Sequence, residues 1–432
     1  MQQNETLQNE QIKKQTKMKT KILISILLVV CTIGAFAQFP KPEYYLKDTI
    51  FNFKDNAMSD WSIKNYQSYY MSFIGEYKQA IKTMDGIYDN TKKERLSLAD
   101  SMAFVSNYKA IDATEYILKR AKNKKVIMIN ESHNMPQQRA YMISLLQKLY
   151  NQGFRYLGME ALGYDSLLNQ RAYPILGTGW LLTEPVMGNV AREAIKIGFK
   201  VFSYEIDRNE AVVPYNPENA FSSQVGTGLE REIRQAFNIM KIFKADSTAK
   251  VVLFAGLGHI CREWDGYMMA SYVWRFLGPG LKNRPLSIDQ DRMIERSDND
   301  IENRYFQLAN ADKPTVYIDS ANNSFRNEYL SDAIDIQVFH PRTKYIAGRP
   351  DWLYNLDRIP FYIDSKKLKI QYPLIVKAYC KGEDISKAVP FDVIQLNDKK
   401  EKKPLLLKKG FYTIELKGLK QSEFIEIEVI QK

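Results

Sequence analysis

Polar and apolar residues follow two different periods between residues 126 and 153. Val126 to Ile129 is an unbroken apolar run rich in branched side chains, which is typical of a strand buried on both faces. A polar stretch, Asn130 to Asn134, separates this run from Pro136, and proline is well tolerated in the first turn of a helix. Beyond it, apolar residues recur at i, i+3, i+4 and i+7: Met142, Leu145, Leu146 and Leu149. The pattern therefore predicts a buried strand, a polar turn and a helix that Gly153 ends.

The same alternation of apolar runs and helical patterns continues along most of the chain. Apolar runs that predict further strands occupy residues 154–160, 199–205, 250–255, 285–289 and 315–319. Helical patterns occupy residues 110–121, 189–197 and a stretch marked by Leu229, Ile233, Phe237 and Met240. Strands that alternate with helices at this spacing indicate an α/β fold with a largely parallel sheet flanked by helices. We expect the right-handed crossover rule to place all these strand ends along one edge.

The pattern changes at both ends of this α/β region. Residues 39–108 are rich in aromatic residues and lysine with helical spacing, which predicts a helical N-terminal cap. From about residue 360 the apolar runs are short and separated by turns, and residues 424–430 alternate with period two, as in a sheet with one solvated face. We expect a cap at 38–108, an α/β domain at 109–358 and a small antiparallel, β-sandwich-like module at 359–432.

A short repeat lies inside the α/β region. Gly153 precedes Glu160 by seven positions, and Gly198 precedes Glu205 by the same distance, each glycine opening a predicted strand. We interpret this as two copies of one βα unit in register. The long irregular segment 161–187 lies between them, and loops of this length in a compact domain are usually functional.

Carboxylates and imidazoles follow several of the predicted strands. Glu131 and His133 follow the strand at 126–129, Glu160 and Glu205 end the next two, and the strand at 250–255 leads into His259. Ligands of open α/β sheets bind at the carboxyl ends of strands, so we expect these side chains to converge. A neutral imidazole that a carboxylate orients can deprotonate water, while a second histidine or carboxyl group protonates the leaving group.

The same residues allow other interpretations. Four of them are of metal-ligand type: Glu131, His133, Glu160 and His259. They could hold a divalent metal that activates water, and the sequence leaves both schemes open. Glu205, Arg262 and Asp289 are candidates for binding the substrate or supporting the site. In a purely structural alternative, the glutamates stabilise helix N-termini and the histidine fills a polar gap.

Composition and missing motifs narrow the function classes. The 432 residues are 45% hydrophobic and 26% charged, as in ordinary globular proteins. The net charge is +11, and +8 remains without the five lysines and two glutamates of residues 1–37. The lysines at 397–409 have no interleaved aromatic residues, which favours a solvated loop over a nucleic-acid site. No phosphate-binding or dinucleotide glycine motif is present, and Cys261 lacks the sequence context of a nucleophile, so we expect an inert thiol.

The first 37 residues have the organisation of a secretory signal peptide. Two lysines precede the apolar run 22–36, which ends in the A-x-A pattern of Ala35 to Ala37. Met18 is a start that suits this pattern, and the run is too short for a membrane span. Anchoring as a lipoprotein through Cys31 is less favoured, because valine stands where a small residue is needed. We expect an exported, periplasmic or secreted protein whose mature chain begins near Gln38.

These motifs together resemble those of the erythromycin esterase/ChaN-like superfamily. The stretches that carry the resemblance, within residues 110–345, are VIMINESHNMP, LLQKLYNQGFRYLGMEAL and VVLFAGLGHICR. The superfamily has one strand that runs into Glu-x(1–2)-His, a second that ends in Glu, and a later apolar strand that ends in Gly-x-Gly-His. The resemblance implies an α/β fold with its site at the strand ends.

The two branches of the superfamily imply different functions. In the esterase branch water opens a lactone, which implies that His133 is the base with Glu131, Glu160 and His259 around it. In the ChaN-like branch the domain binds haem. Asn130 stands where the superfamily usually has glycine, and the Glu-Ser-His spacing is the shorter, ChaN-like one.

Three hypotheses follow from the sequence. The first is an exported hydrolase of ester, lactone or amide bonds that acts on a small molecule. The second is a protein that binds haem or another iron-bearing ligand without turnover. The third is a surface-assembly module whose C-terminal β region docks a partner.

Overall fold

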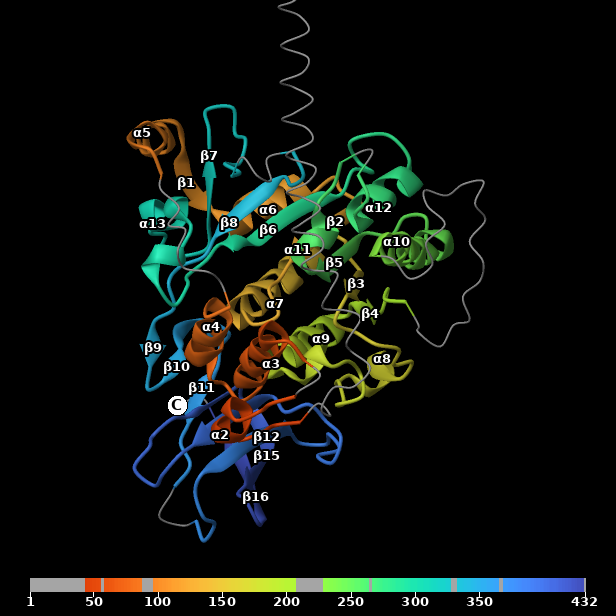
Figure 1. Ribbon diagram of the computed structural model, residues 1–432. Coiled ribbons are helices and arrows are strands. Elements are labelled where there is room, and N and C mark those ends of the chain that lie inside the picture. Colours follow the sequence, from red (N-terminus) through yellow and green to blue (C-terminus); the bar gives the residue numbers. More distant parts are fainter. Residues whose placement is uncertain are drawn as a thin grey trace, which may run out of the picture. The chain divides into compact units, whose positions relative to one another are not determined.

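An eight-stranded sheet forms the centre of the described part of the chain (Figure 1). The computed structural model describes residues 43–55, 58–87, 96–206, 228–263, 266–327, 332–364 and 368–430. The strand order in this sheet is β1-β7-β8-β6-β2-β5-β3-β4. The strands are β1 (Lys109–Asp112), β2 (Val126–Asn130), β3 (Tyr156–Met159), β4 (Lys200–Phe202), β5 (Val251–Ala255), β6 (Leu286–Met293), β7 (Thr315–Ile318) and β8 (Ile336–Phe339).

Most of these strands run parallel. β2 pairs in parallel with β5 and β6, β3 with β4 and β5, and β6 with β8. The predicted largely parallel α/β sheet is therefore confirmed. β7 runs antiparallel to both β1 and β8. The expectation that every strand ends at one edge is thus wrong for 315–319, because an antiparallel strand ends at the opposite edge of the sheet.

Helices cover both faces of the sheet (Figure 1). One face packs against α6 (Ala113–Ala121), α7 (Pro136–Asn151) and α9 (Pro185–Ile197), and the other against α10 (Gly228–Ala245) and α12 (Met269–Leu277). Shorter elements are α8 (Leu168–Arg171), η2 (Leu181–Thr183), α11 (Leu257–Ile260), η4 (Asn299–Ile301) and α13 (Arg304–Ala309).

β2 is buried on both faces, as its unbroken apolar sequence predicts. Ile127 and Ile129 belong to the core on the α7 and α9 side, whereas Val126 and Met128 belong to the core on the α10 and α12 side. None of these four side chains has any solvent exposure. A strand with two buried faces positions the turn that follows it firmly, and this turn carries Glu131 and His133.

The helix predicted at 110–121 begins later than expected. Residues 109–112 form β1, whose Lys109 pairs with Ile318 of β7. The Asp112 side chain then accepts a hydrogen bond from the Glu115 backbone N–H at 3.1 Å, which caps α6 at its first turn. The alanine-rich pattern could not reveal β1, because the pairing depends on a strand two hundred residues away.

The region predicted as an N-terminal cap is helical where the structure describes it. Its helices are α2 (Lys47–Phe51), α3 (Asp60–Phe73), α4 (Tyr77–Asp85) and α5 (Leu98–Asn107). The segment 161–187 contains α8 and η2, and α9 begins at Pro185 rather than near 189 because Glu184 caps it. Ile175 forms a β-bridge with Ala388, so this loop packs against the C-terminal region.

A second, antiparallel sheet forms at the C-terminal end, with strand order β13-β12-β15-β16. The elements of this region are β9 (Tyr345–Ile346), β10 (Arg349–Pro350), α14 (Asp351–Tyr354), β11 (Ile359–Phe361), β12 (Leu374–Cys380), β13 (Asp392–Leu396), β14 (Leu405–Leu407), β15 (Gly410–Lys417) and β16 (Ser422–Val429). This small antiparallel module was expected, and β16 shows the alternating burial that its period-two pattern predicts.

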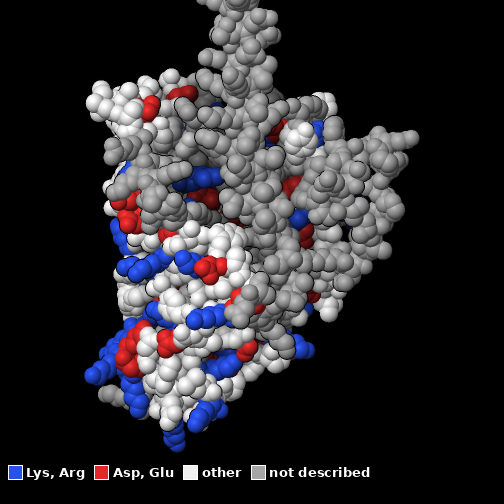
Figure 2. Space-filling view, in the orientation of Figure 1, with Lys and Arg blue, Asp and Glu red and all other residues white. Residues whose placement is uncertain are grey.

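The lysine-rich stretch 397–409 is only partly the solvated loop that its composition suggests. Lys399, Lys400 and Lys402 are exposed, and basic side chains are numerous on the visible face over the C-terminal sheet (Figure 2). Residues 405–407, however, form the buried strand β14, which pairs with β11. Lys403 makes a 2.6 Å ion pair with Glu76, so one of these lysines connects the module to the N-terminal helices.

Residues Pro42–Lys432 form one compact unit. The domain divisions expected at 108/109 and 358/359 stay predictions. The signal-peptide region, Cys31 and most of the irregular segment before α10 lie outside the described residues. Among the helices that the structure describes, none combines the length and the apolar character needed to cross a bilayer.

Candidate active site

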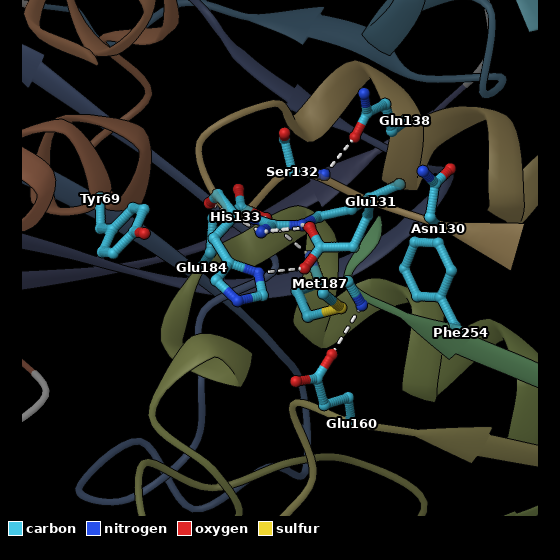
Figure 3. A network of polar contacts seen from close by, with 12 residues as sticks. Tyr69, Asn130, Glu131, Ser132, His133, Gln138, Glu160, Glu184, Met187 and Phe254 are labelled. Atoms are coloured by element: carbon cyan, nitrogen blue, oxygen red, sulfur yellow. Dashed lines mark hydrogen bonds and ion pairs between the residues drawn. The ribbon is translucent and has the colours of Figure 1, made fainter. Parts of the chain in front are cut away.

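The carboxyl ends of β2, β3 and β5 hold the predicted site residues, and Figure 3 shows those that follow β2 and β3: Glu131, His133 and Glu160. Glu131 directly follows β2, and its backbone N–H donates to the Ala255 carbonyl at 2.8 Å. Glu160 directly follows β3, and its N–H donates to the Phe254 carbonyl at 3.0 Å. His259 lies on α11, immediately after β5. Parallel pairing therefore extends one residue past the strands and brings these three side chains to one edge of the sheet.

Glu131 and His133 form a carboxylate–imidazole pair. The His133 Nδ1 lies 2.5 Å from Glu131 Oε1, and Nε2 on the far side of the ring points away from this carboxylate (Figure 3). The His133 side chain is 31% exposed, whereas Glu131 is buried. Burial lowers the pKa of His133, but Glu131 and more weakly Glu160 outweigh burial and raise it above the ordinary histidine value.

Arg139 holds the Glu131 carboxylate in place. Its Nε and Nη2 donate to Glu131 Oε2 at 3.0 and 2.8 Å, and Nη2 also donates to the His133 carbonyl at 2.8 Å. Burial alone would raise the pKa of Glu131, but Arg139 and His133 outweigh it, so the pKa lies below its usual value. The carboxylate is therefore ionised, accepts from His133 Nδ1 and fixes the tautomer of the ring.

Glu184 is the second acidic partner of Arg139. Its Oε2 accepts from Arg139 Nη1 at 2.9 Å and from the Met187 backbone N–H at 2.7 Å, which caps α9. All three charged groups of the Glu131–Arg139–Glu184 triad are almost fully buried. Burial raises the pKa of Glu184 above its usual value, and Arg139 offsets this only in part. Arg139 thus balances two carboxylates in a region that water does not reach.

Glu160 and His259 form a second group of charges beside the first. His259 Nε2 lies 3.0 Å from Glu160 Oε1, and its Nδ1 lies 2.7 Å from the Glu232 carboxylate. Burial opposes protonation of His259, but Glu160 and Glu232 outweigh burial and raise its pKa to about 10. The raised pKa favours the imidazolium form at neutral pH, with a carboxylate on each side of the ring, so His259 is less suited than His133 to act as a base.

Arg231 connects the second group with Glu205. Its Nη2 donates to Glu160 Oε1 at 2.8 Å, and its Nε donates to both oxygens of Glu205 at 3.1 Å. Nη1 also lies 3.0 Å from His259 Nε2, so the guanidinium and the imidazole ring share the Glu160 carboxylate. The structure thus places all five predicted strand-end residues in one connected region.

The proposed helix-capping role of the glutamates holds in part. Glu160 Oε2 accepts from the Gly256 backbone N–H at 2.6 Å, at the start of α11. Burial would raise the pKa of Glu160, but His259 and Arg231, and His133 more weakly, lower it well below its usual value. One carboxylate therefore positions the His259 turn and also acts electrostatically on His133.

Aromatic side chains form a wall beside His133. The Tyr69 ring lies edge-on to the His133 ring with 5.9 Å between centroids (Figure 3). Trp180 packs against Tyr69, Tyr66 and Phe73, all from α3. The N-terminal helices and the 161–187 segment therefore both border the site, which only the tertiary structure reveals.

Asp289 and Arg262 lie in supporting positions. Asp289 is buried and accepts from Asn130 Nδ2 at 2.7 Å, directly behind the Glu131 turn, and burial raises its pKa. Arg262 is also buried, forms an ion pair with Asp335 and donates Nε to the Pro285 carbonyl at 2.9 Å. These contacts favour a support role for Asp289 and a purely structural role for Arg262, in place of the substrate contact considered from the sequence.

Two other groups behave as structural residues. Burial raises the pKa of the Cys261 thiol to about 12, which suits the expected inert thiol. His340 follows β8 and, because of burial, has its pKa lowered to about 3; its Nε2 lies 3.0 Å from Gln290 Oε1. A histidine that follows a strand therefore does not by itself indicate a catalytic residue.

The four residues considered as metal ligands do not fit a metal ion. Glu131 is engaged by Arg139 and His133, and Glu160 by Arg231 and a protonated His259. Cationic side chains therefore already occupy the places that a cation would take. In the part of the chain that the structure describes, no group of three or more His, Cys, Asp or Glu side chains could hold a metal ion.

Four charged residues of the site were not predicted from the sequence: Arg139, Glu184, Arg231 and Glu232. Arg139 lies three positions before Met142, on the face of α7 that the apolar pattern predicts to be buried. A charged residue on a predicted buried face was the one indication in the sequence that Arg139 has a buried acidic partner. On α10 the predicted stripe was partly wrong, since Phe237 is 47% exposed while Glu232 is buried. The buried face of α10 includes Glu232, which contacts His259, beside the apolar residues Ile233, Ala236 and Ile239.

Comparisons with known proteins add little to this geometry. No protein-family model matches the sequence, and no curated protein matches it. The type III effector HopBA1 is similar in structure at 13% identity and a TM-score of 0.31, over 54% of this chain and 97% of that one. A structure of ChaN from Campylobacter jejuni with cofacially bound haem is similar at 13% identity and a TM-score of 0.25, over 44% and 94%.

A third similar structure is the C-terminal region of Pasteurella multocida toxin, which has a thiol-protease like catalytic triad. It matches at 10% identity and a TM-score of 0.28, over 83% of this chain and 51% of that one. At these values none of the three likenesses carries an argument about chemistry. Function must be argued from the Glu131–His133 pair and its surroundings.

Proposed function

We propose that this protein is an exported hydrolase that cleaves an ester, lactone or amide bond with His133 as general base. The observation that carries the proposal is the 2.5 Å contact between His133 Nδ1 and the buried Glu131 carboxylate, on an imidazole that is still 31% exposed. A carboxylate that accepts from Nδ1–H leaves the lone pair of the neutral ring at Nε2, on the side of the ring that faces away from Glu131.

The reaction needs only water and the substrate. Nε2 of neutral His133 takes a proton from water as the water oxygen bonds to the carbonyl carbon, which gives a tetrahedral intermediate and an imidazolium. The bond from this carbon to the leaving oxygen or nitrogen then breaks with its electron pair. The imidazolium returns its proton to the leaving group, and His133 is neutral again.

Arg139 and Glu131 prepare His133 for both steps. Glu131 stabilises the imidazolium that forms on proton uptake, and Arg139 keeps Glu131 ionised although it is buried. Glu160 adds a second negative charge near the ring and is itself held by Arg231 and His259. Because His259 is protonated at neutral pH, its role in this scheme is to position Glu160 rather than to accept a proton.

The test is a hydrolysis screen of the mature chain on activated esters, simple lactones and anilides. We expect activity on at least one class, and a loss of about 10²- to 10⁴-fold in kcat for His133→Ala. His340→Asn is the control, because that buried histidine contacts Gln290 and is not part of the Glu131–His133 pair, and both variants are compared by circular dichroism first. Full activity of His133→Ala on every substrate of the parent protein would refute the proposal.

The parent protein and His133→Ala also test the alternative function, haem binding. Haemin is titrated into the parent protein and into His133→Ala, and absorbance is followed in the Soret region. The hydrolase is supported if His133→Ala abolishes hydrolysis and does not change any Soret band seen with the parent protein. A Soret band that His133→Ala removes, in a protein without hydrolytic activity, supports the binding protein and overturns our proposal.

A further inference from the structure

Ser132 separates the two members of the Glu131–His133 pair. Because only one residue stands between them, the distance between the carboxylate and the imidazole depends on the backbone angles of Ser132. The 2.5 Å contact between His133 Nδ1 and Glu131 Oε1 therefore requires a particular conformation at Ser132. β2 ends at Asn130, so Ser132 lies past the regular strand and needs other contacts to hold this conformation.

All three polar groups of Ser132 have a partner. Its backbone N–H donates to Gln138 Oε1 at 2.5 Å (Figure 3), and its carbonyl accepts from the Met135 backbone N–H at 2.9 Å. Its hydroxyl group donates to the Asp291 carboxylate. A half-buried serine with every polar group paired has little conformational freedom.

β6 holds two of these partners in place. β2 pairs with β6 as far as Ile129, and beyond this point side chains continue the connection. Gln138 Nε2 donates to the Gln290 carbonyl at 2.9 Å, and Gln290 Nε2 donates to the Asn130 carbonyl at 2.7 Å. Asp291 is the next residue of β6. Ser132 is therefore fixed to the central sheet through both Gln138 and Asp291.

The Ser132 hydroxyl group does not face the proposed base. In Figure 3 it points to the Gln138 side of the turn, whereas the His133 ring points the opposite way. A nucleophilic serine is hydrogen-bonded to its base, but this hydroxyl group is bonded to Asp291 instead of His133. The arrangement favours a role through the backbone over nucleophilic attack.

We propose that Ser132 is the residue that positions His133. Its bonds to Gln138 and Asp291 hold the backbone in the conformation that brings the carboxylate and the imidazole together. This inference rests on the proposed function, since it assigns the orientation of the base in that reaction. Without these bonds the carboxylate and the ring separate for part of the time, and Nε2 loses its fixed direction. Misplacement of a catalytic group by about 1 Å can cost about 10²-fold in rate.

The first test measures the pair without turnover. The pKa of His133 is followed by nitrogen NMR of the histidine rings across pH, and the spectrum of His133→Ala assigns the signal. In the parent protein this pKa is raised above the ordinary histidine value. We expect Ser132→Ala and Gln138→Met to lower it toward that value, because the Glu131 carboxylate then contacts the ring less often.

Two comparisons separate positioning from general damage to the fold. Ser144→Ala and Gln147→Met are the matched controls, because both residues are exposed on the helix that carries Gln138, and they should leave the pKa of His133 unchanged. Asp291→Asn is the conservative variant. It should keep most of the raised pKa, because an amide oxygen also accepts from the Ser132 hydroxyl group.

The second test is hydrolysis. On a substrate that the parent protein cleaves, Ser132→Ala should lower kcat by about 10- to 100-fold and leave KM unchanged, because the base is misplaced while substrate binding is not affected. If the parent protein cleaves no substrate, the proposed function fails, whereas the NMR measurement still decides whether Ser132 holds the pair together.

Three results would overturn the inference. The first is an unchanged pKa of His133 in Ser132→Ala, and the second is a change no larger than that of the controls. The third is an equal fall in Asp291→Asn and Ser132→Ala, since the charge of Asp291 and not its bond to serine would then act on the ring. If circular dichroism shows that Gln138→Met does not fold, Ser132→Ala alone decides, because it removes only one hydroxyl group.

Discussion

Replacing Arg139 by methionine tests whether the buried triad is the structural basis of the site. Methionine keeps much of the volume of the arginine stem and removes only the guanidinium. Four contacts are lost: two to Glu131, one to Glu184 and one to the His133 carbonyl. Two carboxylates with almost no solvent exposure then lose the Arg139 charge, and Glu131 keeps only its contact with His133.

The magnitude follows from the burial of the triad. Removal of one partner of a buried ion pair typically costs about 3–5 kcal/mol, because it leaves an uncompensated charge. Such a loss is a large part of the stability of an ordinary protein. Protonation relieves the penalty, since in the variant the folded-state pKa values of Glu131 and Glu184 rise above their unfolded values. The variant therefore gains stability as pH falls, and its deficit is smaller at pH 5 than at pH 8.

The assay is denaturant unfolding of the parent protein and of Arg139→Met at both pH values. Arg155→Met serves as the control, because Arg155 is exposed with its guanidinium over the Tyr150 ring, and it should cost about 1 kcal/mol or less at either pH. A deficit for Arg139→Met that matches the control, or one that does not change with pH, would refute the argument from buried charge.

Three further predictions concern single groups. The folded-state pKa of His259 is about 10, so the stability that its protonation contributes is complete below pH 6.5, roughly, and is lost as pH rises toward 10. The free energy of unfolding should therefore fall with pH across this range in the parent protein, and His259→Gln should remove this dependence. Glu131→Gln should lower kcat by about 10²- to 10⁴-fold. It should also move the acid limb of the pH–rate profile to lower pH, because this carboxylate raises the pKa of His133. An acid limb that does not move would mean that another group is the base. The half-buried Cys261 thiol has its pKa raised to about 12 and should react with iodoacetamide at pH 8 far more slowly than a free cysteine. Cys261→Ser should keep full activity, and rapid labelling detected by mass spectrometry would contradict the raised pKa.

The sequence alone determined the elements whose patterns are local. The period-two alternation of β16 indicates a strand, and the short, branched apolar run of β2 between polar residues favours one, because hydrophobic burial acts through the spacing of neighbouring side chains. The same reasoning found the strand-end residues, since parallel strands bring their carboxyl ends together wherever they lie in the chain. Glu131, Glu160 and His259 meet for this reason.

Only the tertiary structure decided which charges these residues meet. β1 and the reversed direction of β7 depend on pairing between distant segments, and Arg139 and Arg231 reach the site from helices whose rotation no local pattern fixes. Each buried carboxylate must find a counter-charge, and any arginine in the chain could in principle supply it. The choice is made by packing, which sets the helix positions. It thereby surrounds His259 with carboxylates that raise its pKa and leaves the partly exposed His133 as the candidate base.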